Sequence, residues 1–156
     1  IRPDFVFLTG WEAVLVPMLL IGCDGGTNAT SGVVPELTRE VYELTITGRI
    51  AEAVQLQYRL LELFDTMLYS ADFPEGFRAA VELRGFQMGS SRQPLSPNQQ
   101  IDRAALQRVL RCILSDFGYV DPPPEGCPPR TGNMEEDRVA QITQHVIKAL
   151  HDRGMI

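Results

Sequence analysis

The sequence predicts an α/β protein in which two parallel strands come first and a run of helices follows. "FVFL", Phe5 to Leu8, is a short continuous apolar run that ends at Thr9-Gly10, which is typical of a strand buried on both faces. A helix predicted from Trp11 to Ile21 separates this strand from a second one predicted from Gly26 to Ser31. A strand, a helix and a second strand in this order are typical of a parallel sheet.

Proline and glycine mark the limits of the remaining elements. Pro17 lies inside the first predicted helix, where we expect it to remove a hydrogen bond and kink the helix. Gly22 to Gly25 is predicted to turn into the second strand. After it, apolar residues at helical spacing predict four further helices. These extend from Pro35 to Thr47, Ile50 to Tyr69, Phe73 to Arg84 and Ile101 to Phe117.

Charge and hydropathy exclude two classes of partner. The 156 residues carry a formal net charge of −6, which argues against a surface that neutralises nucleic-acid phosphates. The apolar run from Phe5 to Ile21 is interrupted by polar residues and by Pro17, whereas a spanning helix needs about 20 largely apolar residues. We therefore expect neither a nucleic-acid nor a membrane partner.

The cysteines bear on the compartment. Cys23, Cys112 and Cys127 are far apart, odd in number and form no Cys-x-x-Cys pair. This pattern predicts neither a disulfide framework nor a zinc site, and we expect no metal and no cofactor. A cytoplasmic location is the resulting expectation, because reducing compartments keep thiols free. The chain opens at Ile1-Arg2-Pro3, which suggests a piece of a longer protein.

One long stretch resembles a known enzyme superfamily. "FLTGWEAVLVPMLLIGCDGGTNATSGVVPELTREVYELTITGRIAEAVQLQYRLLEL", with the later "FRAAVELRGF" and "RQPL", is similar to the C-terminal part of the dihydrodipicolinate synthase and N-acetylneuraminate lyase superfamily. The similarity is strongest to the 2-keto-3-deoxy sugar-acid aldolase branch and covers roughly residues 4 to 117. It implies a TIM (β/α)8 barrel. In that barrel Phe5 to Leu8 would be the seventh strand and Gly26 to Ser31 the eighth, followed by the C-terminal helices.

The resemblance also implies a chemistry. Such enzymes are carbon–carbon lyases, class I aldolases, that bind pyruvate or a 2-keto-3-deoxy sugar acid as a Schiff base on a lysine of the sixth strand. That strand would precede Ile1. The one lysine of the chain, Lys148, falls in the terminal segment opposite its apolar stripe, which favours a surface position. We therefore expect no catalytic residue in this chain and no activity from it alone.

Two parallel strands cannot close a barrel, so the resemblance has a structural consequence. A complete barrel takes about 250 residues and eight strands. We expect this chain to be a fragment or one half of a split barrel, with the remaining strands as its partner. Because family members are commonly tetramers, the resemblance also implies a homo-oligomer.

Four residues match positions of the substrate-binding surface in the family. Gly10 and Glu12 match a Gly-x-Asp/Glu turn at the mouth of the seventh strand, where Glu12 would accept hydrogen bonds from substrate hydroxyls. Thr27 matches the position that packs on the pyruvate methyl or carboxylate. Ala29 stands where sialic-acid lyases tend to carry serine, which favours a smaller deoxy sugar acid over N-acetylneuraminate. The alternative for Glu12 is that it caps the helix that follows it.

The end of the chain suggests a different function. Residues 1–118 form the barrel portion, 119–134 a Pro/Gly-rich linker and 135–156 an amphipathic helix. The helix would lie in a groove on a partner, such as a microcompartment shell, or pack on its own barrel. A non-catalytic docking module is therefore the alternative to a lyase. The apolar stripe of this helix consists of Val139, Ile142, Val146 and Leu150.

Overall fold

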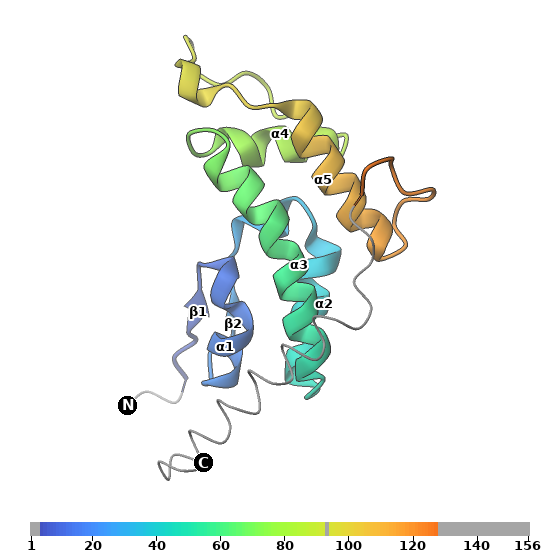
Figure 1. Ribbon diagram of the computed structural model, residues 1–156. Coiled ribbons are helices and arrows are strands. Elements are labelled where there is room, and N and C mark those ends of the chain that lie inside the picture. Colours follow the sequence, from blue (N-terminus) through green and yellow to red (C-terminus); the bar gives the residue numbers. More distant parts are fainter. Residues whose placement is uncertain (1–3, 93, 128–156) are drawn as a thin grey trace.

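Helices make up most of the fold (Figure 1). The structure is a computed structural model, and it describes residues 4–92 and 94–127. The elements in chain order are β1 (Leu8–Thr9), η1 (Glu12–Val14), α1 (Leu15–Leu20), β2 (Gly25–Gly26), η2 (Ala29–Gly32), α2 (Pro35–Ile46), α3 (Ile50–Tyr69), α4 (Glu75–Leu83), η3 (Pro97–Gln99) and α5 (Arg103–Asp116). None of these helices is long and apolar enough to cross a membrane.

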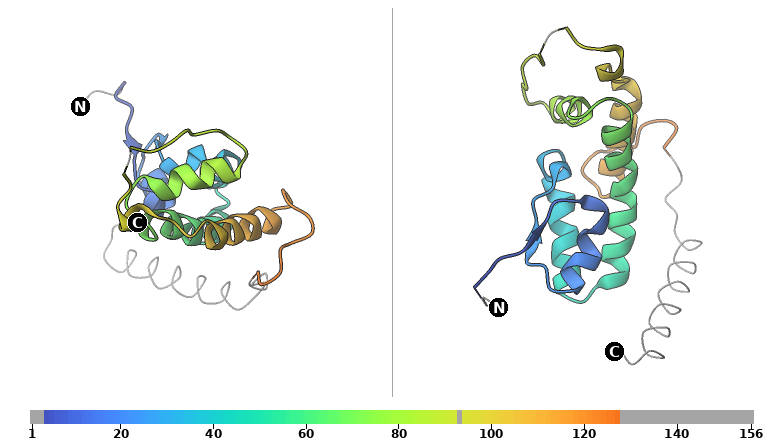
Figure 2. Two further views of the ribbon diagram at one scale, coloured as in Figure 1. Left: turned by 90° about the horizontal axis from the view of Figure 1, so that it is seen from above. Right: turned by 90° about the vertical axis from the view of Figure 1, so that its left-hand side faces the viewer.

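The two strands form a parallel pair, as the sequence predicts. Leu8 lies opposite Gly25, and Thr9 lies opposite Gly26. The helix α1 connects the strands and packs on α2 and α3, so that the small sheet lies on one side of the helical layer (Figure 2). The predicted order of strand, helix and strand is therefore confirmed.

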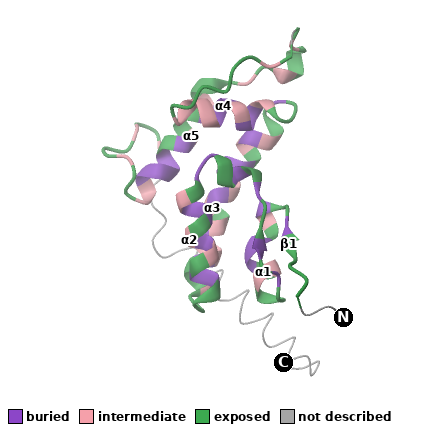
Figure 3. Ribbon diagram, turned by 180° about the vertical axis from the view of Figure 1, so that it is seen from behind, coloured by how far each residue is buried: buried purple, intermediate pink, exposed green. Residues whose placement is uncertain are grey.

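The first strand is shorter and more exposed than the sequence predicts. Of "FVFL" only Leu8 belongs to β1, and Phe5, Val6 and Phe7 expose 64%, 63% and 54% of their surface. Figure 3 shows the segment before β1 as exposed. The prediction of burial on both faces is wrong for this chain, because among the described residues β1 pairs with β2 alone.

The prediction of a second strand from Gly26 to Ser31 is correct for Gly26 and wrong for the residues after it. The strand β2 ends at Gly26, and η2 replaces the remainder. The backbone N–H of Ser31 donates to the carbonyl of Asn28 at 3.2 Å, so these groups bond within the turn and cannot bond to a strand. Alternating polar and small residues do not distinguish such a turn from a short strand.

Pro17 does not interrupt a helix. Because η1 takes up residues 12–14, α1 begins at Leu15 and Pro17 falls in its first turn. A proline is tolerated there, since the first N–H groups of a helix have no partner within it. The expected kink inside a longer helix is therefore wrong.

The helices α2 and α3 run in opposite directions and are joined by a tight turn (Figure 1). Gly48 occupies the left-handed region with φ of 80°, and its N–H donates to the carbonyl of Thr45 at 3.1 Å. Glycine adopts this conformation without a steric cost, so Gly48 ends α2 as predicted. The predicted bounds of α3 are confirmed at both ends.

The hydrophobic core lies where α3 packs against α2 and against α5, which Figure 3 shows as buried bands on these helices. Each helix contributes leucines at helical spacing, and α1 and α4 cover the edges. The largest fully buried side chains include Leu37, Val41, Leu63, Met67, Leu106, Leu110 and Ile113.

The crossing of α4 over α3 depends on one glycine. A Cβ added at Gly76 would lie 2.0 Å from the carbonyl oxygen of Met67, far inside van der Waals contact. Only glycine therefore allows the two helix backbones to approach this closely.

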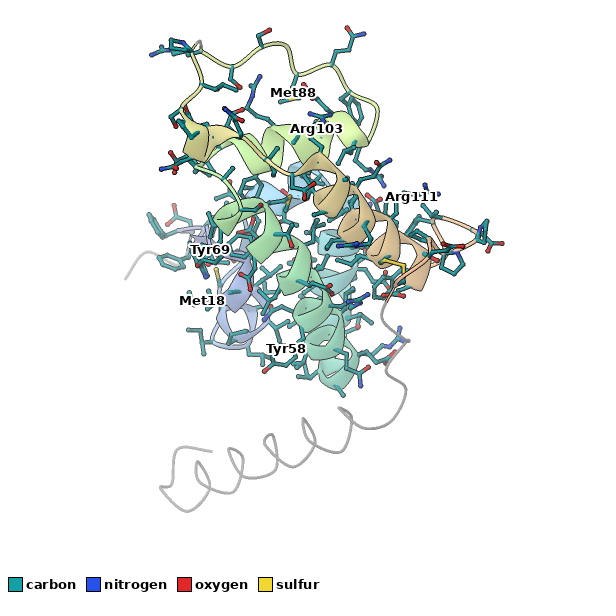
Figure 4. All side chains as sticks on the ribbon, turned by 45° about the horizontal axis from the view of Figure 1, so that its top comes forward. Met18, Tyr58, Tyr69, Met88, Arg103 and Arg111 are labelled. Atoms are coloured by element: carbon teal, nitrogen blue, oxygen red, sulfur yellow. A yellow bond between two sulfur atoms is a disulfide. The ribbon has the colours of Figure 1, made fainter. Side chains whose placement is uncertain are left out.

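A disulfide joins Cys112 of α5 to Cys127, and Figure 4 shows it as the yellow bond near the end of α5. The expectation that the cysteines form no disulfide is thus wrong for Cys112 and Cys127, whereas Cys23 is free. The chain turns back after α5 because Gly118, with φ of 78°, reverses its direction, and the N–H of Tyr119 donates to the carbonyl of Leu114 at 2.8 Å. The cysteine pattern accordingly no longer supports a reducing compartment.

The disulfide also attaches the beginning of the proline-rich linker to the barrel portion, whereas the sequence predicts a free, extended linker from residue 119. The predicted terminal helix, with Lys148, lies outside the described residues.

Candidate functional site

The C-terminal ends of β1 and β2 lie next to each other at the same end of the sheet. Because β1 and β2 are parallel, the residues that follow them leave the sheet on the same side. The N–H of Thr27 donates to the carbonyl of Thr9 at 2.8 Å, which places Gly10 and Thr27 at neighbouring strand ends. The structure therefore brings together residues from the two turns that the sequence singled out.

Three of the four predicted site residues are exposed. Gly10, Thr27 and Ala29 are open to solvent, and a Cβ added at Gly10 would meet nothing within 4 Å. A ligand could therefore approach the backbone at Gly10 and the hydroxyl of Thr27 without displacing protein atoms. Ala29 is the first residue of η2 and lies two residues after Thr27.

Glu12 differs from the other three because it is buried, with 8% of its surface exposed. Its Oε1 atom accepts a hydrogen bond of 2.6 Å from the backbone N–H of Thr30, the second residue of η2. Glu12 is the first residue of η1, whose N-cap position is occupied by Trp11. The carboxylate thus joins the turn after β1 to the turn after β2.

The opposite ends of the strands are held by a second set of bonds. The N–H of Phe7 donates to Oδ2 of Asp24 at 2.7 Å, and the N–H of Asp24 donates to the carbonyl of Phe7 at 2.8 Å. The thiol of the buried Cys23 donates to the same carbonyl at 3.0 Å. The glycine-rich stretch therefore forms a hydrogen-bonded turn that sets the position of β2.

Gln57 of α3 is a site-supporting residue that the sequence analysis missed. Its Oε1 accepts from the N–H of Val16 at 2.7 Å, and its Nε2 donates to the carbonyl of Ala13 at 3.0 Å. These bonds hold the segment after Glu12 against α3. The sequence does contain a signal for this role. Gln57 lies four positions after Ala53 and three before Leu60, so it is a polar residue on the buried face of the helix.

Trp11 is a second residue that the sequence analysis missed. It lies between Gly10 and Glu12, and its ring packs edge-on against Phe64 of α3 with centroids 5.2 Å apart. About half of its surface, 47%, stays exposed. As the one tryptophan of the chain, it gives a fluorescence signal from this site alone.

The described residues include no lysine, since Lys148 is the only one in the sequence. They also contain no cluster of three or more histidine, cysteine, aspartate or glutamate side chains that could hold a metal ion. The arrangement offers backbone groups, a hydroxyl and a buried carboxylate, which suit the binding of a polar ligand. It offers no amine for covalent catalysis.

Comparison with known proteins identifies the family to which this chain belongs. The sequence profile of the Dihydrodipicolinate synthetase family matches residues 1–113. The chain is 34% identical over 108 residues to 4-hydroxy-tetrahydrodipicolinate synthase of Methanopyrus kandleri, covering 69% of this chain and 36% of that protein. It is 36% identical over 109 residues to an uncharacterized DapA-like lyase of Halobacterium salinarum, covering 70% of this chain and 36% of that protein.

Solved structures agree with the sequence comparison. 2-Keto-3-deoxygluconate aldolase of Sulfolobus solfataricus superposes with a TM-score of 0.64 at 19% identity, covering 77% of this chain and 42% of that one. N-acetylneuraminate lyase of Fusobacterium nucleatum gives a TM-score of 0.59 at 21% identity, covering 74% and 38%.

The fold is accordingly the C-terminal part of a TIM barrel, with two βα units and the C-terminal helices. The chain belongs to the dihydrodipicolinate synthetase family. It spans less than two fifths of the length of the curated relatives it matches.

Proposed function

We propose that this chain supplies the seventh and eighth strands of a carbon–carbon lyase that forms a Schiff base with pyruvate or with a 2-keto-3-deoxy sugar acid. The observation that carries the proposal is the hydrogen bond between Thr27 and Thr9, which aligns two open strand ends. In TIM-barrel enzymes the chemistry takes place at this end of the strands. The reactive lysine would come from another strand of the complete barrel.

The exposed residues before β1 support the presence of further strands. Phe5, Val6 and Phe7 are apolar and mostly solvent-exposed, although parallel strands are normally covered on both faces. A neighbouring strand on the outer edge of β1 would cover part of this apolar surface and pair with the backbone of that edge. Under this proposal the remaining barrel strands, on the same or on a separate polypeptide, occupy this position.

The site residues divide into two roles under this proposal. Gly10, Thr27 and Ala29 face the substrate, with the Thr27 hydroxyl bonding its carboxylate and the small Ala29 leaving room for a sugar-like chain. Glu12, already bonded to Thr30, holds η2 beside them. The complete enzyme would be a homo-oligomer.

The test is an assay of the complete protein, with the remaining strands present. We expect it to release pyruvate from 2-keto-3-deoxy sugar acids. Thr27→Val keeps the shape of the side chain and removes its hydroxyl, so kcat/KM should fall about tenfold, equal to about 1.4 kcal/mol. Thr47→Val, at the exposed far end of α2, is the matched control and should leave kcat/KM unchanged. Absence of cleavage, or equal values for both variants, would contradict the proposal.

A second candidate function rests on the sequence after residue 127. Apolar residues at helical spacing from Val139 to Leu150 favour docking of this segment in a groove on a partner, such as a microcompartment shell protein. Deletion of residues 128–156 leaves the disulfide intact and should abolish co-purification with such a partner. Unchanged association after the deletion would rule out this function.

A further inference from the structure

Two buried polar atoms beside Glu12 lack a hydrogen-bond partner. Among the described residues, the Oδ1 atom of Asn28 and the Oγ1 atom of Thr30 are inaccessible to solvent and bond to no protein atom. Asn28 exposes 8% of its surface and Thr30 exposes 1%. A buried polar group without a partner is costly, and native proteins usually satisfy such groups with an ordered water.

Both side chains line a small cavity between the strand ends and the helices. The cavity has a volume of about 10 Å³. This is close to the smallest space that holds one water molecule. Its polar wall residues are Glu12, Asn28, Thr30, Thr38 and Gln57, and the rest of the wall consists of leucine and valine side chains.

The other polar side chains of the wall are already engaged. Gln57 uses its oxygen to accept from Val16 and its nitrogen to donate to Ala13. The hydroxyl of Thr38 donates to the carbonyls of Val34 and Pro35 within α2. The groups that remain for a guest are therefore those of Glu12, Asn28 and Thr30, since the rest of the wall is aliphatic.

These three groups match the bonding capacity of one water. A carboxylate and an amide oxygen both accept, so each needs a donated proton, and a water has two to give. The hydroxyl of Thr30 can in turn donate to the oxygen of the water. An apolar guest would leave Oδ1 of Asn28 and Oγ1 of Thr30 without a partner. With three partners the water has the number of bonds that buried waters typically make.

We propose that one ordered water occupies this cavity, donates to Glu12 and to Asn28, and accepts from Thr30. The water and the bond between Glu12 and Thr30 then join the turn after β1 to the turn after β2 at two points. Thr27, which directly precedes Asn28, is held in place by this joint. The water would be present whether or not the complete protein is a lyase.

The direct test is a crystal structure of the protein at a resolution that resolves single waters. We expect a spherical density peak about 2.7–3.1 Å from Oδ1 of Asn28, Oγ1 of Thr30 and one carboxylate oxygen of Glu12. Three results would overturn the proposal. These are an empty cavity, an Asn28 amide turned to donate directly to Glu12, and a metal ion with shorter contacts to several oxygens.

A variant pair provides an independent test in solution. Thr30→Val removes the hydroxyl at nearly constant volume, so the thermal midpoint should fall by roughly 2–8 °C and magnetisation transfer from water to the amide of residue 30 should disappear. Thr45→Val is the matched control, because Thr45 is also buried but its hydroxyl donates within α2 to Val41. The control should retain the transfer at residue 30. Absence of this transfer in the parent protein would refute the water site even if the midpoint of Thr30→Val falls.

Discussion

The Oε1 atom of Glu12 accepts a hydrogen bond of 2.6 Å from the backbone N–H of Thr30 across the two strand ends. Both residues are buried, so the bond is shielded from competing water. It links the two turns that carry the exposed residues Gly10, Thr27 and Ala29. The carboxylate of Glu12 therefore sets the relative position of these two turns, and with it the shape of the candidate site.

Removal of the carboxylate should weaken the fold. We expect Glu12→Ala to lower the free energy of unfolding by about 2 kcal/mol, because the N–H of Thr30 loses a charged acceptor in a buried place. Urea titration monitored by Trp11 fluorescence measures the change. Asp65→Asn, at an exposed position of α3, serves as the control and should stay within about 0.5 kcal/mol of the parent. Equal stability of both variants would show that the bond contributes nothing.

Gln57 should matter in the same region. Gln57→Leu leaves the N–H of Val16 and the carbonyl of Ala13 without partners, so we expect a loss of about 2–4 kcal/mol in the free energy of unfolding. Gln107→Leu, on the exposed face of α5, controls for the change of a glutamine to leucine in a helix. If both variants lost the same stability, the bridging role of Gln57 would be wrong.

The crossing of α3 and α4 gives a steric prediction. Gly76→Ala would place a methyl group against the carbonyl of Met67, so the helices must move apart. We expect a loss of about 1–3 kcal/mol or more in the free energy of unfolding. Gly32→Ala is the control, since nothing lies within 4 Å of its added Cβ. Thermal unfolding followed by circular dichroism compares the two, and an unchanged midpoint for Gly76→Ala would argue against this crossing.

The disulfide should stabilise the end of α5. Cys112 and Cys127 are 15 residues apart, and closing a loop of this length contributes about 3 kcal/mol in the chain-entropy estimate. We expect dithiothreitol to lower the thermal midpoint of the parent chain and to have no further effect on Cys127→Ser. Alkylation of the unreduced, unfolded chain should modify Cys23 alone. Modification of all three cysteines under these conditions would disprove the pairing.

One exposed ion pair gives a pH-dependent prediction. The guanidinium of Arg49 donates hydrogen bonds to Glu52 and lowers the pKa of that carboxyl below its ordinary value. A lowered folded pKa means that the pair stabilises the fold above the ordinary pKa, and that this contribution is lost as the pH falls through the folded pKa. An NMR titration of the Glu52 side chain should give a midpoint below that of an unpaired glutamate. Arg49→Gln should raise it back.

Local rules were sufficient to predict most of the helices from the sequence. The bounds of α3 follow from an uninterrupted apolar stripe between Gly48 and Ser70, and the end of α2 follows from the glycine itself. The parallel pairing of β1 and β2 follows from the order of a strand, a helix and a second strand along the chain.

Tertiary contacts decided the features that the sequence did not reveal. The disulfide needs the chain reversal at Gly118, which cysteine spacing does not reveal. The short second strand reflects hydrogen bonds that Asn28 and Glu12 make within and between the turns. The bridging role of Gln57 depends on where α1 docks on α3. Each of these features depends on a contact between two segments of the chain, which the periodicity of apolar residues within one segment does not predict.

The most direct test of the proposed function is borohydride trapping of the complete protein with pyruvate. The lysine amine would condense with the pyruvate carbonyl and release water, and hydride from borohydride would reduce the resulting C=N bond to a stable secondary amine. Peptide mass mapping should locate the adduct on a lysine outside these 156 residues. An adduct on Lys148, or no adduct on any lysine, would contradict the assignment of this chain as the part of a Schiff-base lyase that binds substrate without the reactive amine.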